Sequence, residues 1–365
     1  MKNRRLVTVF AGICLLSILV AVPLLAACAA PAPAPSPAPA PAPEAELPEI
    51  EVKLQAWHGA EPVGSPFYWE WPARLIEEAT NGRAEVTIYW SLALAGPKDL
   101  YRAIQEGIVD VSWVWAPVLP GVFSLSEIVQ LPGLFPNQAT GNIVMNELLR
   151  QYPQFEEQFS PKVKYLSTQV HMRADLHSDV PIRTLDDIKG KVIACDSASV
   201  AEALGALGAS ASVMPVPDMY LAMQRGVIDG TVQAWGSFYT YHMEEVTQYH
   251  TLISISPGVS LWFWNMDNWN KFTPEEQQKL ELLAPRLQET VVVGNVVSSM
   301  EVRMEKVTPE HGHELIEWSK EDMDRMRELF RPMWNEWAEE MEELGYPGQD
   351  ILRDAERLIA GYVYG

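Results

Sequence analysis

Aromatic side chains gather at the ends of predicted strands, the edge where an open α/β sheet usually binds ligands. Trp57 and His58 follow the apolar run EVKLQA, Trp113 and Trp115 end a second run, and Trp235 ends a third. Side chains alternate along a strand, so Trp113 and Trp115 should share a face. Each tryptophan alone is equally compatible with core packing. The set at equivalent strand ends favours recognition of a large apolar or ring-bearing body.

Residues able to perform catalysis or to bind a metal are few. Cys195 lies inside an apolar strand, where a thiol behaves as an inert small hydrophobe. His311-Gly312-His313, with Glu310 and Glu314 on either side, weakly resembles a metal site, but its polar surroundings favour a loop. The sequence contains no Gly-x-Ser-x-Gly elbow and no glycine-rich phosphate loop. We therefore expect no enzyme, no cofactor and no metal.

A repeated segment indicates which elements position the aromatic residues. DLYRAIQEGIVD (99–110) recurs 119 residues later as DMYLAMQRGVIDG (218–230), with six of the first twelve positions identical. Apolar residues at helical spacing and a leading aspartate, a good N-cap, predict a helix in each copy. Gly107 and Gly226 should end these helices in a left-handed conformation. The runs IVDVSWVW and VIDGTVQAW then read as strands. Each copy should be a helix, a tight turn and a strand.

Further strands precede each copy, EVTIYW at 85–90 and KVIACD at 191–196. Strand, helix and strand in series favour parallel sheets covered by helices, and two such units imply two α/β lobes that face each other across a cleft. The alternative is one large doubly wound domain in which the repeat arose by local convergence. In either case the fold class is α/β.

The N-terminal segment has the pattern of a bacterial lipoprotein signal over residues 1–27. Basic MKNRR precedes an apolar run that closes on Leu25-Ala26-Ala27, directly before Cys28, the residue that would carry lipid. The alternative is a single transmembrane anchor, since the apolar run is nearly the roughly 20 residues that span a bilayer. Residues 28–48 are mostly Ala and Pro and predict an extended tether. The body should then be extracytoplasmic and held at a membrane, in the periplasm or on the cell surface.

The net charge limits the possible partners of the mature chain, and the cysteine content limits its disulfides. Removal of Lys2, Arg4 and Arg5 with no acid would change the formal net charge from −21 to −24, which makes nucleic acid or anionic lipid an unsuitable partner. Cys14 would leave with the signal and Cys28 would carry lipid, so only Cys195 remains. An exported body with one thiol has no internal disulfide and must rely on a large core.

Three ordered motifs give the chain a family resemblance. VPIRTLDDIKGKVIA (180–194), MPVPDMYLAMQRGVIDG (214–230) and FTPEEQQKLELLAP (272–285) resemble the solute-binding subunits of tripartite ATP-independent periplasmic (TRAP) transporters, over roughly residues 52–341. The resemblance implies a two-lobed, type II-like periplasmic binding protein that captures a small organic solute and delivers it to a membrane permease without catalysis. Lobe I would cover 49–168 with a return segment about 257–300, and lobe II 169–256, followed by C-terminal helices about 301–365. A solute-binding lipoprotein of an ATP-driven importer is the alternative, ahead of an exported enzyme.

One departure from the family concerns the ligand charge. The strand after the DIKG motif usually bears an arginine that pairs with a ligand carboxylate in two hydrogen bonds, and here that position is Ala194. Lys191 is too near the start of the strand to substitute, whereas Arg173 either replaces the arginine or lies on the surface. Gln233 aligns with a position that usually places an amide or acid on the ligand. The predicted ligand-binding residues are Trp57, His58, Trp113, Trp115, His171, Arg173, Ala194, Asp196, Ser197, Gln233 and Trp235.

The missing arginine and the tryptophans together predict a bulky or ring-bearing organic acid rather than a C4-dicarboxylate or a sialic-acid-like sugar. His58 and His171 offer donors, although each is equally compatible with a structural role. Trp262 and Trp264 should line the joint between lobes, or else the cleft. Residues 274–307 read as helices, bent or broken at Pro285 and Gly294. The acidic run 336–345 should be a solvated helix face, with partner binding as the alternative.

Overall fold

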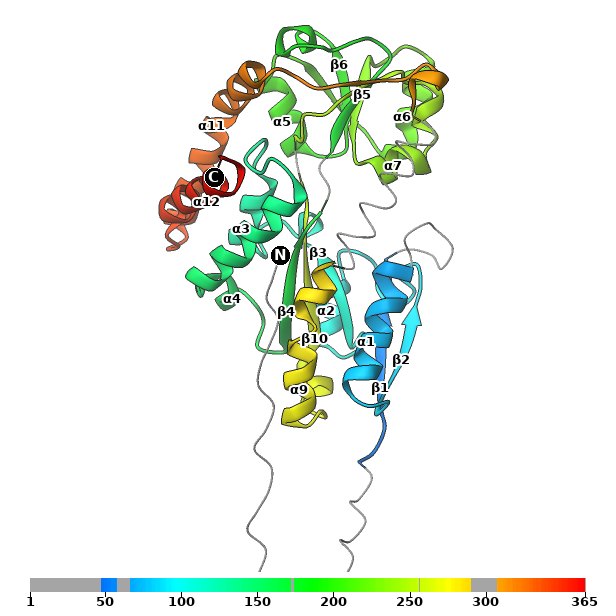
Figure 1. Cartoon of the computed structure of the whole chain (residues 1–365), viewed down its shortest axis with the longest axis vertical. Helices are drawn as coiled ribbons and strands as arrows, with labels where there is room; N and C mark the ends of the chain where they lie inside the picture. Colours follow the sequence, from blue (N-terminus) through cyan, green and yellow to red (C-terminus); the bar gives the residue numbers. More distant parts are fainter. Residues whose placement is uncertain (1–46, 58–65, 172–173, 256, 290–306, 365) are drawn as a thin grey trace, which may run out of the picture. The chain divides into compact units, whose positions relative to one another are not determined.

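The computed structural model describes residues 47–57, 66–171, 174–255, 257–289 and 307–364. Residues from Leu47 onward form one compact unit that contains two β-sheets with helices packed on them (Figure 1). The predicted α/β class is confirmed. None of the helices in the described part of the chain combines the length and apolar character needed to span a membrane.

The first sheet has the strand order β2-β1-β3-β10-β4. Its strands are β1 (Ile50–Gln55), β2 (Ala84–Tyr89), β3 (Val111–Trp115), β4 (Val163–Val170) and β10 (Val259–Asn265). β1 is parallel to β2 and β3, whereas β10 is antiparallel to both β3 and β4. Around it lie η1 (Pro66–Glu70), α1 (Trp71–Ala79), α2 (Leu100–Gln105), η2 (Ala116–Val118), η3 (Ser124–Gln130), α3 (Gln138–Gln151), α4 (Gln154–Glu157), α8 (Met266–Trp269) and α9 (Pro274–Glu281).

The second sheet has the strand order β11-β9-β5-β8-β6-β7. Its strands are β5 (Asp175–Ser178), β6 (Val192–Cys195), β7 (Ser210–Val213), β8 (Gly230–Gln233), β9 (Tyr249–Thr251) and β11 (Glu314–Ile316). β6 is parallel to β7 and β8, and β5 is antiparallel to β8 and β9. The helices here are η4 (Leu185–Ile188), α5 (Ala198–Ala206), α6 (Val216–Gln224), α7 (Trp235–Thr240), η5 (Met243–Glu245) and η6 (Pro309–His311).

Both sheets are mixed, so the predicted parallel pairing accounts for only part of each sheet. In the first sheet the predicted strands β2 and β3 both run parallel to β1, which lies between them, and in the second sheet β6 pairs directly with β8, so the predicted units are parallel although β2 and β3 are not neighbours. β10 comes late in the chain and inserts between β3 and β4, while β5 borders β8 in the other sheet. Long-range pairing of this kind leaves no local sequence pattern.

The two repeats have the predicted helix, turn and strand, as α2 with β3 and α6 with β8. Gly107 and Gly226 have φ values of 71° and 65°, the left-handed conformation expected at a helix end. The predicted capping by the leading aspartates is wrong. Asp99 precedes α2 but its carboxylate contacts Arg102 Nη2 at 2.7 Å, and Asp218 lies inside α6, which begins after Pro215.

Three apolar clusters form the core of the described residues. The largest joins residues of both sheets and of the two helices at the C-terminal end, including Val114, Leu176 and Phe330. A second cluster fills the space between the first sheet and α1, α8 and α9, and it contains Trp262 and Trp264, which are 0% and 1% exposed. The prediction that these two tryptophans line a joint or cleft is therefore wrong. A third, smaller cluster packs α6 and α7 on the second sheet.

The C-terminal part is helical where it is described. After α9 the chain turns at 282–283 and resumes as a helix at 284–289, so the break predicted near Pro285 is present, whereas Gly294 lies outside the described residues. α11 (Lys320–Glu343) and α12 (Gly348–Tyr364) follow. Trp334 Nε1 donates to Pro132 O at 2.9 Å and Trp318 Nε1 to Ile182 O at 3.1 Å, which ties this segment to regions near each sheet.

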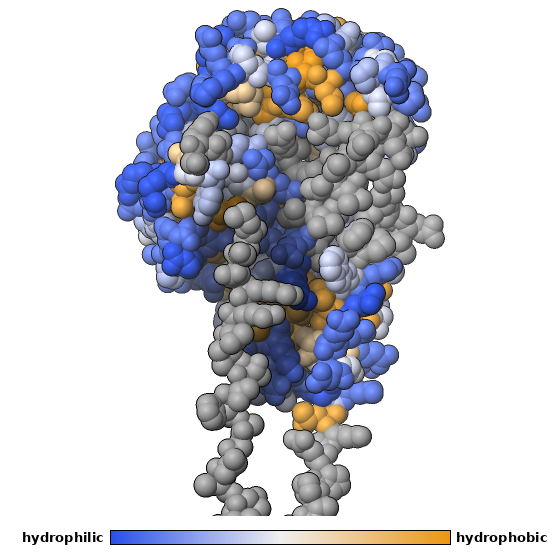
Figure 2. Space-filling view, in the orientation of Figure 1, coloured by the Kyte–Doolittle hydropathy of each residue, from blue (hydrophilic) through white to orange (hydrophobic). Residues whose placement is uncertain are grey.

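The acidic run at the end of α11 is a solvated face, as predicted. Glu336, Glu339, Glu340, Glu342 and Glu343 are exposed, while Trp337, Ala338 and Met341 between them are buried. Figure 2 shows a mostly hydrophilic surface over α11 and α12 on the face in view.

Candidate ligand-binding site

Three of the predicted tryptophans contact one another at the end of β3. Trp57 Nε1 donates to Trp113 O at 2.8 Å, and its ring meets that of Trp113 edge-on with centroids 6.0 Å apart. Trp113 and Trp115 lie 6.5 Å apart, which agrees with the expected shared face of the strand. Trp113 is buried, whereas Trp57 and Trp115 are half-buried and keep part of their rings accessible.

Gly258 holds Trp115 in place. A Cβ atom at this glycine would lie 1.9 Å from Trp115 Cη2, so the indole rests directly on the backbone that leads into β10. Any side chain at position 258 would displace the ring. The position of Trp115 therefore depends on a glycine 143 residues further along the chain.

His171 closes this aromatic cluster. Its ring stacks on Trp113 with centroids 4.4 Å apart and an interplanar angle of 14°, and it meets Trp115 edge-on at 4.8 Å. Its backbone N–H donates to Gly258 O at 2.8 Å. These contacts fix the orientation of the imidazole among the tryptophans.

A chain of hydrogen bonds sets the tautomer of His171. Gln169 Nε2 donates to Leu287 O at 2.6 Å, so Gln169 Oε1 accepts from the Ser260 hydroxyl at 3.2 Å. Ser260 Oγ, whose single proton is used in that bond, accepts from His171 Nε2 at 2.6 Å. His171 therefore carries a proton on Nε2.

Gln233 and Trp235 form a second group at the end of β8. Trp235 begins α7 rather than ending the strand, and its Nε1 donates to Asp175 Oδ2 at 2.9 Å. Gln233 Nε2 contacts Met219 Sδ at 2.9 Å. Gln233 Oε1 is buried with no hydrogen-bond partner among the described residues. A buried acceptor without a partner costs free energy, and a ligand donor would relieve that cost.

Ala194 lies in the third core cluster with Met219 and Trp235 and is fully buried. No cationic side chain of β6 can therefore serve the site at this position. Its neighbour Cys195 is a buried free thiol whose pKa is raised by burial, which agrees with an inert role. Asp196 is exposed, and Ser197 is the residue that precedes α5.

The structure thus places the predicted residues in two groups. Trp57, Trp113, Trp115 and His171 contact one another, while Gln233, Trp235 and Ala194 lie near Met219 of α6, beside the second sheet. Asp196 and Ser197 follow β6 and precede α5. His58, Arg173 and Cys28 lie outside the described residues.

Sequence reasoning missed several supporting residues. Asp175, which is 1% exposed and accepts from Trp235 Nε1, begins β5, whose sequence DLHS is mostly polar and gives no local sign that the carboxylate is buried. Gly258, Ser260 and Gln169 had no local signal, because their roles come from the pairing of β10 with β3 and β4.

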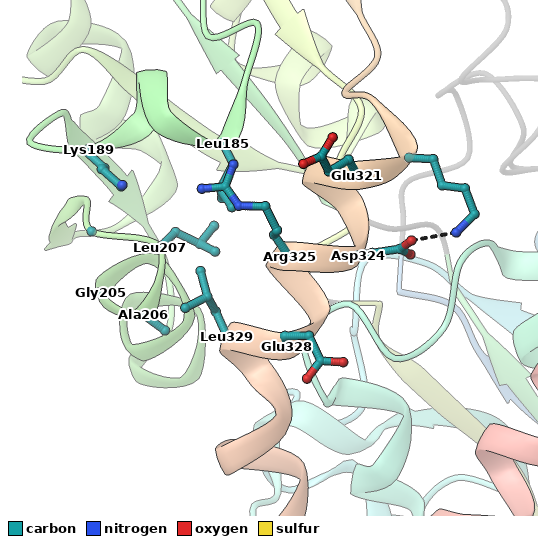
Figure 3. A pocket seen from close by; sticks show the side chains of 12 residues that line it. Leu185, Lys189, Gly205, Ala206, Leu207, Glu321, Asp324, Arg325, Glu328 and Leu329 are labelled. Atoms are coloured by element: carbon teal, nitrogen blue, oxygen red, sulfur yellow. Dashed lines mark hydrogen bonds and ion pairs between the residues drawn. The ribbon is translucent and has the colours of Figure 1, made fainter.

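No group of three or more metal-ligating side chains occurs in the described ranges. His311 ends the short 3₁₀ helix η6 and contacts Thr308 Oγ1 at 3.2 Å through Nδ1, and the buried His313 follows next to β11, so this stretch is a tight turn rather than the polar loop that the sequence predicts. A pocket of about 970 Å³ lies between α11, the segment after η4 and the end of α5 (Figure 3). Its walls include Leu185, Leu207 and Leu329 together with charged residues of α11, and none of the predicted site residues lines it.

Two helix-covered mixed sheets, with aromatic and amide side chains at the ends of β3 and β8, give the chain a two-sheet α/β fold. The model of the family described as "Bacterial extracellular solute-binding protein, family 7" (DctP) matches residues 69–340. The chain belongs to this family.

Two curated relatives and one solved structure illustrate the similarity. The C4-dicarboxylate-binding periplasmic protein DctP of Rhodobacter capsulatus is 28% identical over 184 residues, which cover 49% of this chain and 54% of that protein. The uncharacterized protein YiiZ of Salmonella typhimurium is 24% identical over 56% of this chain and 64% of its own length. The matches thus span between half and two thirds of these relatives. A TRAP periplasmic solute-binding protein from Desulfovibrio salexigens has a TM-score of 0.76 at 23% identity, covering 86% of this chain and 97% of that one.

Proposed function

We propose that this chain is the extracytoplasmic solute-binding subunit of a TRAP-type secondary transporter, and that it captures a ring-bearing organic acid for delivery to the membrane permease. The observation that carries the proposal is the cluster of Trp57, Trp113, Trp115 and His171 at the end of β3. Partly accessible indoles offer flat apolar faces. A ligand ring can stack on such a face, whereas a short dicarboxylate has little apolar surface to pack against it. No catalytic role is assigned.

Solved structures of the same fold support this ligand class. One from a marine metagenome is described as specific for aromatic acid ligands, and one from Rhodoferax ferrireducens contains copurified benzoate. At 21% and 19% identity they establish the fold alone, so the ligand class for this chain stays a proposal. Ala194 adds support, because the family arginine that would fix a ligand carboxylate is absent there and the aromatic side chains are left to supply more of the binding.

Each group of residues has a proposed role. The indoles of Trp57, Trp115 and Trp235 pack against the ligand ring, and His171 and the amide of Gln233 supply polar contacts. Arg173 is the proposed partner of the ligand carboxylate. Lobe I, 49–168 with a return segment about 257–300, and lobe II, 169–256, would close on the solute by the hinge motion of periplasmic binding proteins. Asp196 and Ser197 would border the opening.

A thermal-shift panel tests the ligand class. Benzoate, 3-hydroxybenzoate and mandelate should raise the Tm, because a ligand at a hundred times its Kd adds about 2.7 kcal/mol to the free energy of unfolding. Succinate, malate and a sialic acid should have little effect at the same concentration. A clear shift with succinate at low micromolar concentration, retained in Arg173→Ala, would overturn both the ligand class and the role of Arg173.

We also propose that Cys28 carries lipid and anchors the protein to the membrane. The sequence Leu25-Ala26-Ala27-Cys28 is the basis, followed by the Ala/Pro-rich tether at 28–48. Cys28→Ser should release the protein from the membrane fraction or leave its signal uncut. If the variant fractionates and migrates like the wild type, the lipid anchor is excluded and a transmembrane anchor is preferred.

A further inference from the structure

Three buried histidines form a continuous hydrogen-bonded chain in the second sheet. His177 Nδ1 lies 2.9 Å from His250 Nδ1, and His250 Nε2 lies 3.0 Å from His313 Nδ1. At the inner end His177 Nε2 contacts Gln233 O at 3.2 Å. His177 and His250 are 0% exposed, whereas His313, next to β11, is 9% exposed. The chain runs from near the surface to the backbone of a proposed ligand contact.

The partners allow a single arrangement of protons in the neutral chain. Gln233 O can only accept, so His177 must donate from Nε2 and accept at Nδ1. His250 then donates from Nδ1 and accepts at Nε2, and His313 donates from Nδ1. Every N–H of this neutral arrangement points inward, towards Gln233 O.

His177 also contacts the side chains around the proposed site. It meets Trp235 edge-on with centroids 4.7 Å apart and packs against Phe238 at 4.2 Å. His177, Thr231 and Ala194 pair across neighbouring strands, so they lie on the same face of the sheet. The chain of hydrogen-bonded histidines therefore starts, at His177, on the face of the sheet that carries Ala194, the position of the family arginine.

Few charged groups face the chain in the described residues. Asp175, two residues before His177 on β5, accepts from Trp235 Nε1. From α7 only Trp235 and Phe238 contact His177. At the outer end, His311 repels a charge on His313, and Glu314 pairs with Arg183. Burial lowers the pKa of His177 to about 3, and burial together with His311 lowers the pKa of His313.

We propose that His177 is a positioning residue for Gln233 and Trp235, and that the neutral histidine chain makes ligand binding acid-sensitive. The inference rests on the proposed function, because it takes these two residues as ligand contacts. When the hydrogen bonds between the three histidines are broken, each imidazole can accept a proton below its ordinary pKa of about 6.5. When these bonds are intact, the buried imidazoles resist protonation. Acid therefore favours the open form, in which Gln233 and Trp235 lose their support. The apparent Kd rises as the competent fraction falls.

The test measures the Kd of 3-hydroxybenzoate by calorimetry between about pH 7.5 and pH 5, where this probe remains largely anionic. The affinity of the wild type should fall roughly tenfold as the pH is lowered over this range. Each proton taken up when the histidine hydrogen bonds break changes the Kd by at most tenfold per pH unit. His177→Phe removes the donor to Gln233 O and should bind weakly throughout. His177→Gln places an amide nitrogen near the former Nε2, so it should restore most of the affinity at pH 7.5 and flatten the pH profile.

Two results would overturn the inference: superimposable pH profiles for wild type and His177→Gln, or wild-type affinity of His177→Phe at pH 7.5. Failure of wild type to bind any ring-bearing acid at pH 7.5 would instead refute the proposed ligand class. Nitrogen-15 NMR of ligand-free protein tests the chain independently of any ligand. It should show the proton of His177 on Nε2 and those of His250 and His313 on Nδ1, and any other pattern contradicts the chain.

Discussion

At the scale of single residues, the candidate site depends on contacts between positions far apart in sequence. Trp115 rests on Gly258, and His171 is held both by Gly258 O and by the hydroxyl of Ser260. In the proposed site the tryptophans supply the binding surface, while Gly258 and Ser260 fix where Trp115 and His171 point. Substitutions in β10 and just before it should therefore change ligand binding even where the ligand is not touched.

Gly258→Ala tests this dependence. The added methyl would meet Trp115 Cη2 at 1.9 Å, so the indole must move. We expect the free energy of unfolding to fall by about 1–3 kcal/mol, the usual cost of overpacking, and ligand affinity to fall with it. Urea unfolding and calorimetry measure the two effects.

Gly205→Ala is the matched control. Gly205 lies in α5 with nothing within 4 Å of an added Cβ, so alanine should raise stability by up to about 1 kcal/mol and leave affinity unchanged. Equal behaviour of the two alanine variants would show that Gly258 has no special role in placing Trp115.

The sequence predicted the aromatic residues of the candidate site but not the residues that hold them in place. The indoles could be predicted because they follow recognisable strands. Gly258, Ser260 and Gln169 could not, since a glycine or serine near a strand has no local signal of the ring that packs on it. Trp262 and Trp264 show the converse error: they alternate like site residues but face α1 and α8 in the core.

At the scale of elements, the helix, turn and strand repeat was predictable because all its signals are local. Gly107 and Gly226 occupy equivalent left-handed positions after α2 and α6. A Cβ atom added at Gly226 would have no neighbour within 4 Å. At Gly107 it would meet only the side chain of Asn265, at ordinary van der Waals distance.

Gly107→Ala and Gly226→Ala should therefore each lower the free energy of unfolding by a similar amount, about 1–2 kcal/mol, because both pay mainly the left-handed backbone cost. Chemical denaturation checks this. A loss confined to one of the two variants would contradict their structural equivalence.

The start of α9 is fixed by a capping box between Thr273 and Glu276, and Glu276 also accepts from Arg83 Nε at 2.7 Å. The hydrogen bond from Arg83 lowers the pKa of Glu276 from its ordinary value of 4.5 to about 2. Because the folded pKa lies below the unfolded one, the stabilisation is complete above about pH 4.5 and is lost as the pH falls towards 2.

Glu276→Gln should lower stability by roughly 1.5–3 kcal/mol at neutral pH, the range for hydrogen bonds to charged groups. The difference between wild type and variant should shrink between pH 4.5 and 2. Denaturant titrations across this pH range measure it, and a constant difference would mean that the ionised carboxylate is not the stabilising form.

At the scale of the whole molecule, the order of strands could be predicted only in part. The two parallel units follow from strand, helix and strand in series, but β10 crosses back into the first sheet and makes it mixed. The segments before β5 and before β10 connect the two sheets, and His171 N donates to Gly258 O between them. This pairing is a natural place for a hinge.

Ligand binding should therefore make the particle slightly more compact. Small-angle scattering of wild type with and without saturating 3-hydroxybenzoate should show a small decrease in radius of gyration, and tryptophan emission should change because Trp115 and Trp235 are proposed contacts. Identical scattering curves would count against closure.

The central claim, that this family member binds a ring-bearing organic acid at the aromatic cluster, is tested most directly by native mass spectrometry of untagged protein purified without added ligand. Tight binders often retain their solute through purification. We predict a bound species that fragmentation identifies as a ring-bearing carboxylic acid, and its loss in Trp115→Ala. A retained C4-dicarboxylate, or a solute held equally well by Trp115→Ala, would contradict the account.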